Sequence, residues 1–293
     1  MRENWYAVEV PPGVPIDDSN RFEALGHDCL IHTYGESVSI HSPHPLIAGI
    51  TARISSSVTV QPLLNTLLRQ LFAALLFEAT RHLPRQTVAV KTPMADVVGP
   101  RGVWVGDIVR PTQQMVVVDI ARGGTVPAYA VYEMLTAVME PSSVRLDSHG
   151  MARTMDANEH VTGVAQLGSK IGGSIQDAVV IIPECMVASA VTIDEMLAEV
   201  YRADKYGKPL MVILLAMVIT PEAIRRLTSK HPHLLIHAAR LDRGMSDADA
   251  LRHMPGMKMA GQIEAGINRL RPVLCGMRTS ARTCSSPRCR GKQ

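Results

Sequence analysis

The chain has 293 residues, of which 46% are hydrophobic and 19% charged, and its formal net charge is +3. This length allows one large domain or two smaller ones, and the composition excludes a wholly disordered protein. Aromatic residues make up only 4% of the chain, which argues against a nucleic-acid platform built on exposed, stacking rings.

The first 43 residues hold short strand candidates, at 5–10 and 37–40, separated by Pro, Gly and Asp. We interpret residues 1–43 as an N-terminal extension without catalytic residues. The first ten residues contain no apolar signal core, so we expect no secretory signal. From 60 to 82, leucines recur at helical spacing after Gln61-Pro62, which predicts a helix whose apolar stripe packs on the core.

Four short apolar runs follow, at 115–120, 177–182, 210–219 and 234–238. The first three are each followed by a loop and a helical stretch, at 128–138, 192–201 and 222–228. This order predicts an α/β fold with a parallel sheet that is covered by helices on both faces. In such sheets ligands bind beyond the carboxyl ends of the strands. The longest apolar run has about half the length that a membrane-spanning helix needs.

The loop after residues 115–120 contains Ala121, Arg122, Gly123 and Gly124. Two glycines allow the backbone to approach a ligand closely, and their amides can bind an anion. The forked guanidinium of Arg122 suits phosphate oxygens. A tight strand-to-helix turn without any ligand is an equally simple interpretation of the glycine pair.

The loop at 184–192 also joins a strand to a helix. Ser189 and Thr192 can donate hydroxyls to a phosphate there, or Thr192 can simply cap the helix. Glu184 either binds ribose hydroxyls or is solvated. A third loop, at 255–262, is a Pro-Gly turn followed by Ala-Gly, whose backbone can bind a planar ring but which by itself is only a turn.

Metal and nucleophile motifs are absent from the sequence as we interpret it. The eleven histidines include no pair at helical ligand spacing with a carboxylate nearby, so we expect no protein-built metal site. The five cysteines are odd in number and scattered, which favours reduced thiols in the cytoplasm. Cys185 has no evident catalytic partner, and no Gly-x-Ser-x-Gly motif occurs.

Taken in order, these segments resemble uracil phosphoribosyltransferase. The residues at 44–47 are similar to the family's His-Pro-Leu-Val opening, and those at 120–124 resemble its Ile-Leu-Arg-Ala-Gly pyrophosphate loop. The residues at 150–153 resemble Gly-Met-Tyr-Arg, and those at 255–262 resemble the uracil-binding Pro-Gly-Leu-Gly-Asp-Ala-Gly-Asp. The match runs from about 44 to 262. It implies a type I phosphoribosyltransferase fold with a small hood that binds the base.

The resemblance also implies roles for particular residues. The donor would be 5-phosphoribosyl 1-pyrophosphate, which carries Mg²⁺ on its pyrophosphate. Arg122 and the loop amides would hold the pyrophosphate, Arg153 would close over it, and Glu184 would position the ribose hydroxyls. The remaining implied contacts are Ala121, Gly123 and Gly124 for the pyrophosphate, Ala188, Ser189 and Thr192 for the 5-phosphate, and Asp242, Gly256, Lys258, Met259, Ala260 and Gly261 for the base region.

The sequence departs from the family pattern in two loops. Ala190 and Val191 stand where the family has two glycines, and a valine there would resist positive φ and crowd a phosphate oxygen. Lys258 and Met259 replace Gly and Asp, which removes a carboxylate; the lysine either pairs with pyrophosphate or blocks the pocket. Two hypotheses follow. The protein is a transferase that uses uracil or a related small heterocycle, or it is a catalytically degenerate relative that serves as a ligand sensor or partner subunit.

The expected organisation is an extension at 1–43, a phosphoribosyltransferase-like domain at 44–262 and a poorly ordered basic tail at 263–293. That tail has seven basic residues and one acid, Glu264, and so carries +6, which leaves −3 on the rest of the chain. A mildly acidic body argues against general nucleic-acid binding. The resemblance implies a homodimer or larger assembly, and we expect a cytoplasmic protein without a membrane partner.

Overall fold

The protein is described by a computed structural model that covers residues 29–121, 123–155 and 161–267. Within these residues one seven-stranded sheet has the order β1-β9-β8-β7-β4-β5-β6. Neighbouring strands from β1 to β5 are parallel, and β6 pairs with β5 in the antiparallel direction. The strands are β1 (Val38–Ile40), β4 (Met115–Ile120), β5 (Val144–Met155), β6 (Val161–Lys170), β7 (Val179–Val187), β8 (Met211–Ile219) and β9 (Leu234–Leu241).

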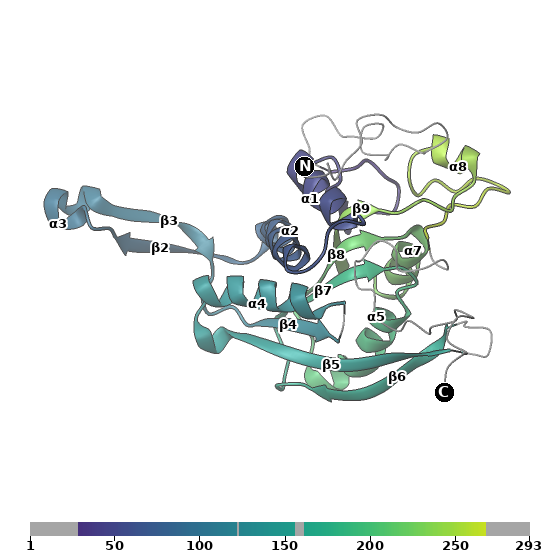
Figure 1. The fold of residues 1–293 in the computed structure, drawn as a ribbon. Helices are drawn as coiled ribbons and strands as arrows, with labels where there is room; N and C mark the ends of the chain where they lie inside the picture. The colour runs from purple at the N-terminus through teal and green to yellow at the C-terminus, as the bar shows by residue number, and fades with distance from the viewer. Residues whose placement is uncertain (1–28, 122, 156–160, 268–293) are drawn as a thin grey trace, which may run out of the picture.

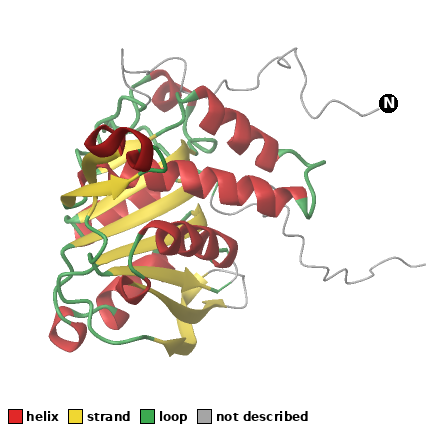
Figure 2. Ribbon diagram, turned by 90° about the vertical axis from the view of Figure 1, so that its left-hand side faces the viewer, coloured by secondary structure: helices red, strands yellow, loops and turns green. Residues whose placement is uncertain are grey.

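Helices cover both faces of this sheet (Figures 1 and 2). One face is covered by α1 (Pro45–Ser55), α2 (Leu63–Ala79) and α4 (Thr125–Val138). The other is covered by α5 (Val191–Glu195), the π-helical turn η5 (Met196–Val200) and α7 (Pro221–Lys230). The described part also has the short helices η2 (Thr80–His82), α3 (Ala95–Val98), η3 (Gly99–Gly102), η4 (Pro141–Ser143), α6 (Ala203–Tyr206) and α8 (Ala248–Arg252).

Alternating side chains of the central strands divide the core into two halves. In β4, Val116 and Val118 pack with α7, whereas Met115 and Val117 pack with α2 and α4. All four are buried. A strand that is covered on both faces needs apolar residues at every position, which is why these strands appear in the sequence as continuous apolar runs.

The predicted fold class is confirmed. The apolar runs at 115–120, 177–182, 210–219 and 234–238 are β4, β7, β8 and β9, and the leucine-rich stretch at 60–82 contains α2. The long β5–β6 ribbon was not predicted from the sequence. Nor was the two-stranded sheet of β2 (Arg85–Lys91) and β3 (Val103–Val109).

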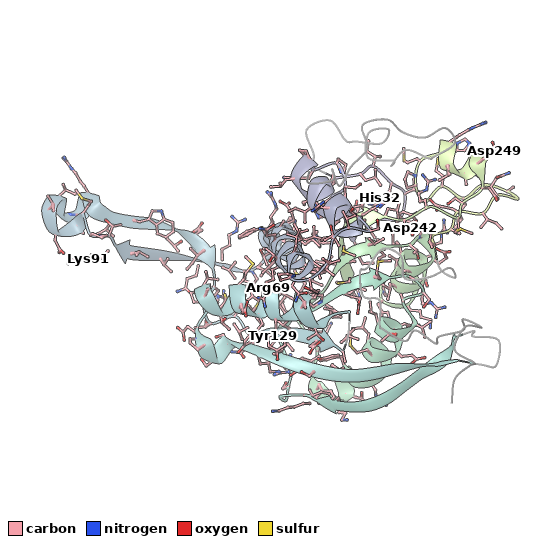
Figure 3. All side chains as sticks on the ribbon, in the orientation of Figure 1. His32, Arg69, Lys91, Tyr129, Asp242 and Asp249 are labelled. Carbon is pink, nitrogen blue, oxygen red and sulfur yellow. The ribbon has the colours of Figure 1, made fainter. Side chains whose placement is uncertain are left out.

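The β2–β3 hairpin, with α3 and η3 at its tip, forms an arm that projects from the body (Figure 1), and Lys91 in Figure 3 marks its outer part. The arm leaves and returns at one point, because Arg110 N donates a hydrogen bond to Pro84 O at 2.9 Å. Its apolar side chains stay exposed, among them Val90, Trp104 and Val105.

Part of the expected N-terminal extension belongs to the main sheet. β1 pairs in parallel with β9, and Leu30, Val38 and Ile40 are buried in the core. The boundary at residue 43 therefore does not separate the described residues 29–43 from the domain. The strand candidate at 5–10 and the tail from 268 lie outside the described residues. Among the described helices, none is long and apolar enough to cross a membrane.

Candidate functional site

The loop at 121–124 directly follows β4, the segment at 184–192 begins in the last residues of β7, and the segment at 255–262 follows α8, which comes after β9. These strands run parallel, so their carboxyl ends lie at one edge of the sheet. Figure 3 marks this edge with Asp242, directly after β9. The edge brings together residues that lie more than a hundred positions apart in the chain.

The loop after β4 contacts the end of β7 at its two glycines. A Cβ atom on Gly123 would lie 2.2 Å from Glu184 Oε1, and one on Gly124 would lie 2.9 Å from the carbonyl oxygens of Ile120 and Pro183. At Gly124 the backbone leaves no room for a side chain, and at Gly123 a Cβ would have to displace the Glu184 carboxylate, so the glycine pair is explained by close approach. The predicted residues Gly123 and Glu184 are thus in contact. Arg122 lies outside the described residues.

Ala121 fixes the start of this loop. Its N–H donates to the carbonyl of His149 in β5 at 2.9 Å. Arg153 lies further along β5, where its backbone pairs with Val164 of β6, and its side chain is not described.

The loop between β7 and α5 turns at Ala190, which has φ 55° and ψ 13°. This corrects two expectations. The positive φ lies at Ala190 and not at Val191, which begins α5, and the helix cap is Ala190 without a side-chain hydrogen bond, not Thr192. An alanine in this conformation is strained, since its Cβ crowds the carbonyl oxygen.

Other contacts hold this loop in place. Thr220, directly after β8, holds the loop with two hydrogen bonds. Its hydroxyl donates to Ala188 O at 2.6 Å, and its N–H donates to Val187 O at 3.1 Å. Ser189 and Thr192 are half-buried, and their hydroxyls make no hydrogen bond to any described residue. Both hydroxyls are therefore available to a ligand.

Asp242 is buried, and backbone amides occupy both of its carboxylate oxygens. Gly244 N donates to Oδ1 at 2.9 Å, and Ile267 N donates to Oδ2 at 3.1 Å. We expected Asp242 to contact substrate. In the structure it instead holds residues 242–267, which we call the hood, at the end of β9.

Glu264 is the centre of the hood and was missed in the sequence. Its buried carboxylate accepts from Tyr34 OH at 2.9 Å and from Gly256 N at 3.0 Å, and it pairs with Arg243 Nε at 2.8 Å and with Arg225. Burial and the neighbouring Glu264 charge raise the pKa of Tyr34. The only signal in the sequence was that Glu264 is the single acid in an otherwise basic stretch.

These bonds position the predicted base segment at 255–262. Thr33 N donates to Pro255 O at 2.9 Å, and Glu264 holds the amide of Gly256, which has φ 87°. A Cβ on Gly256 would also press on Thr33 Oγ1, at 2.7 Å. Beyond this anchor, Lys258, Ala260 and Gly261 are exposed and Met259 is half-buried.

A second cluster that was not predicted from the sequence lies next to the loops of the site. Asp147 in β5 is fully buried; its Oδ2 accepts from Tyr201 OH and its Oδ1 pairs with Arg145 Nε, both at 3.1 Å. His149 Nε2 lies 3.1 Å from Tyr201 OH. Burial lowers the pKa of His149 and raises that of Tyr201. Tyr201 directly follows η5, which continues α5. His149 lies in β5, and its carbonyl accepts from Ala121 N at the start of the loop after β4. The cluster therefore connects η5 to the strand that holds this loop.

Among the described residues, no group of three His, Cys, Asp or Glu side chains is arranged to hold a metal ion. Two acids at this edge each accept a hydrogen bond, as Glu184 Oε1 accepts from Cys185 N at 3.0 Å and Asp119 Oδ1 accepts from Thr125 Oγ1 at 2.9 Å.

Comparison with known proteins gives consistent matches. The sequence model of the family "Uracil phosphoribosyltransferase" matches residues 41–262. A protein of that name from Mycoplasma genitalium is 28% identical over 219 residues, which cover 74% of this chain and 94% of the relative. Another from Renibacterium salmoninarum is 26% identical over 226 residues, covering 76% and 96%. The solved AQ2163 protein from Aquifex aeolicus has the same fold, with a TM-score of 0.56 and 19% identity over 70% of this chain and 87% of that one.

Proposed function

The chain belongs to the uracil phosphoribosyltransferase family, and from this premise we propose that it transfers a phosphoribosyl group to a small heterocyclic base. The donor is 5-phosphoribosyl 1-pyrophosphate with Mg²⁺ on its pyrophosphate. The acceptor is uracil or a related ring, and pyrophosphate is released. The proposed phosphoribosyltransferase-like domain at 44–262 is extended by the described residues 29–43 and 263–267, because Glu264 and Ile267 are bonded into the hood.

The contact between Gly123 and Glu184 carries this proposal. It brings the proposed anion-binding loop after β4 within van der Waals distance of Glu184, an acid near the end of β7. A donor with pyrophosphate on C1 and hydroxyls on C2 and C3 of the ribose presents both groups side by side. We therefore assign the pyrophosphate to the Gly123 amide and to the close backbone approach that Gly124 permits, since Gly124 N itself donates to Ile120 O at 3.1 Å, and we assign Glu184 to the ribose hydroxyls.

The second loop supports the same proposal. Ala190 has the left-handed backbone that a glycine would adopt, so the turn of the family loop is kept although its glycine is replaced. Val191 needs no positive φ. Three residues line this turn and bind the 5-phosphate. They are Ser189 and Thr192, through their hydroxyls, and Ala188, whose carbonyl is held by Thr220. This retained turn favours the transferase over the degenerate sensor.

In the proposed reaction a ring nitrogen of the base forms the new bond to the anomeric carbon, and the bond from that carbon to the pyrophosphate oxygen breaks. The chain contributes position and charge. Arg122 and Arg153 are assigned to the departing pyrophosphate. The base lies against the backbone of Ala260 and Gly261, and Lys258 and Met259 adapt the pocket to an acceptor other than plain uracil.

Calorimetric titration with 5-phosphoribosyl 1-pyrophosphate and Mg²⁺ tests the proposal. We expect micromolar binding, and we expect Gly123→Ala to weaken it at least tenfold because the new Cβ displaces Glu184. Gly49→Ala is the matched control, since a Cβ there meets nothing within 4 Å. Absence of binding in the natural protein would favour the sensor alternative. Equal binding by both alanine variants would refute the placement of the pyrophosphate loop.

We propose that the chain forms a homodimer, as its resemblance to the family implies, and that it works in the cytoplasm. The arm is the surface that we propose for this contact. Its exposed side chains Val90, Trp104 and Val105 are apolar, and exposed apolar patches are typical of interfaces between proteins. A second copy of the chain is the partner we propose for it.

A further inference from the structure

Away from the loops of the site, a cysteine and two histidines form a continuous line of polar contacts. Cys29 Sγ lies 3.5 Å from His41 Nδ1, and His41 Nε2 lies 3.1 Å from His237 Nδ1. The two imidazole rings stack almost parallel, with 10° between their planes and 5.4 Å between their centres. His41 therefore uses one ring nitrogen toward the thiol and the other toward His237.

The backbone holds all three residues in place. Cys29 directly precedes Leu30, whose N–H donates to Ile40 O at 2.7 Å. His41 follows β1, and its N–H donates to Ala238 O in β9 at 2.8 Å. His237 lies within β9 itself. Both histidines are buried, whereas Cys29 is half-buried, so Cys29 is the most exposed member of the line.

Proton positions in such a line are restricted because each short contact needs one donor and one acceptor. If the thiol donates to His41 Nδ1, then His41 carries its proton on Nε2 and donates it to His237 Nδ1. This is the arrangement of a nucleophile, a base and a residue that orients the base. We propose that Cys29 is an activated thiol, with His41 as its base and His237 as the positioning residue, and that it reacts with small neutral electrophiles such as hydrogen peroxide.

The groups that face the histidines suit this assignment. Glu78 on α2 lies close enough to both histidines to interact with their charges, and it is also bonded to Arg81. His82 on η2 is the other titratable group that acts on His237. Burial and the neighbouring His41 lower the pKa of His237 to about 4, so His237 stays neutral at pH 7 and can accept a hydrogen bond.

The proposed oxidation needs only the Cys29 thiol, His41 and the peroxide. His41 takes the thiol proton, and the thiolate sulfur attacks one peroxide oxygen. The S–O bond forms and the O–O bond breaks, sulfur loses two electrons to the peroxide, and the proton leaves with the second oxygen as water. The product is a sulfenic acid on Cys29.

An adduct on Cys29 would act on the hood through a short stretch of chain. Four residues further on, Thr33 holds Pro255 O through both its N–H and its hydroxyl, and Tyr34 holds Glu264. Displacing residues 29–34 therefore loosens the base segment. This consequence for base binding rests on the proposed function, whereas the reactivity of the thiol does not.

Alkylation by iodoacetamide, followed by peptide mass spectrometry on the full chain, tests the reactivity. At pH 7 we expect Cys29 in the folded protein to react at least tenfold faster than Cys29 in the urea-unfolded protein, and buried Cys185 to stay unmodified. We expect His41→Asn to remove this advantage, because asparagine can accept a hydrogen bond but not a proton, and His237→Val to reduce it in part. Equal folded and unfolded rates, which need no variant, would overturn the proposal, as would a folded His41→Asn protein that reacts like the natural one.

Hydrogen–deuterium exchange measures the coupling separately from catalysis. After stoichiometric peroxide treatment we expect faster exchange in residues 255–262, and no change in a Cys29→Ser protein treated in the same way. Unchanged exchange in fully oxidised protein would overturn the link to the hood. A failure of donor binding in the calorimetric test would leave the alkylation result unaffected, so the two proposals fail independently.

Discussion

Ala190 turns the chain from β7 into α5 with the backbone of a left-handed residue, and this conformation strains an alanine. The strain is of the order of 1–2 kcal/mol, and glycine relieves it while adding about 0.5–1 kcal/mol of chain entropy in the unfolded state. We expect Ala190→Gly to raise the free energy of unfolding by about 1 kcal/mol in urea titrations. Ala188→Gly, without positive φ, is the control and should lower it. A loss of stability in both variants would contradict this.

His237 makes the stability of the fold depend on pH in a defined direction. Its pKa is lowered from 6.5 to about 4 by burial and by His41, so the unfolded chain binds the proton more tightly. The contribution is complete above pH 6.5 and is lost as the pH falls toward 4, at up to about 1.4 kcal/mol per pH unit. We expect the difference in unfolding free energy between the natural protein and His237→Val to shrink between pH 6.5 and 4.5. Parallel curves over that range would refute this.

The hood depends on Glu264, whose carboxylate joins Tyr34, Gly256 and Arg243. Glu264→Gln keeps the shape but removes the charge and leaves Arg243 buried without its anion, at a cost of about 3 kcal/mol. We expect faster amide exchange in residues 255–262 and weaker base binding, with donor binding unchanged. Asp249→Asn, on the exposed surface of α8 (labelled in Figure 3), is the control and should alter neither.

The arm is an element that can be removed cleanly, because Pro84 and Arg110 are joined by a hydrogen bond at its base. We expect a variant in which two glycines replace residues 85–109 to keep its fold, as measured by circular dichroism, and to sediment as a monomer where the natural protein sediments as a dimer. Exposed Tyr129 on α4 lies away from the arm, so its replacement with serine tests whether the same dimer also depends on that face. A dimer that survives removal of the arm would place the interface elsewhere.

At the scale of the whole molecule, the family resemblance and the sheet were predictable because buried strands and glycine turns leave strong local patterns. Gly123 and Glu184 were recognised separately, and only the fold shows that they touch. The arm was missed because its strands pack on one another and not on the core, so their sequence lacks a buried face. Asp242 was assigned to the base region through the family resemblance, and no local pattern reveals that the amides of Gly244 and Ile267 bind its carboxylate. The contacts of Glu264 were not predictable for the same reason, since its partners lie elsewhere in the chain.

The position of β1 at the edge of the sheet has a consequence for synthesis on the ribosome. Val38 pairs with Ile236, so about 200 residues must emerge before the first strand finds its neighbour. Such a non-local pairing is slow to form, because the entropy of closing a long loop is lost before the contacts between the strands lower the free energy. β4, β7 and β8 can pair before β9 has been synthesised. Cys29 and His41 therefore exist in the chain long before His237, and formation of β9 is the step that assembles the thiol–imidazole line.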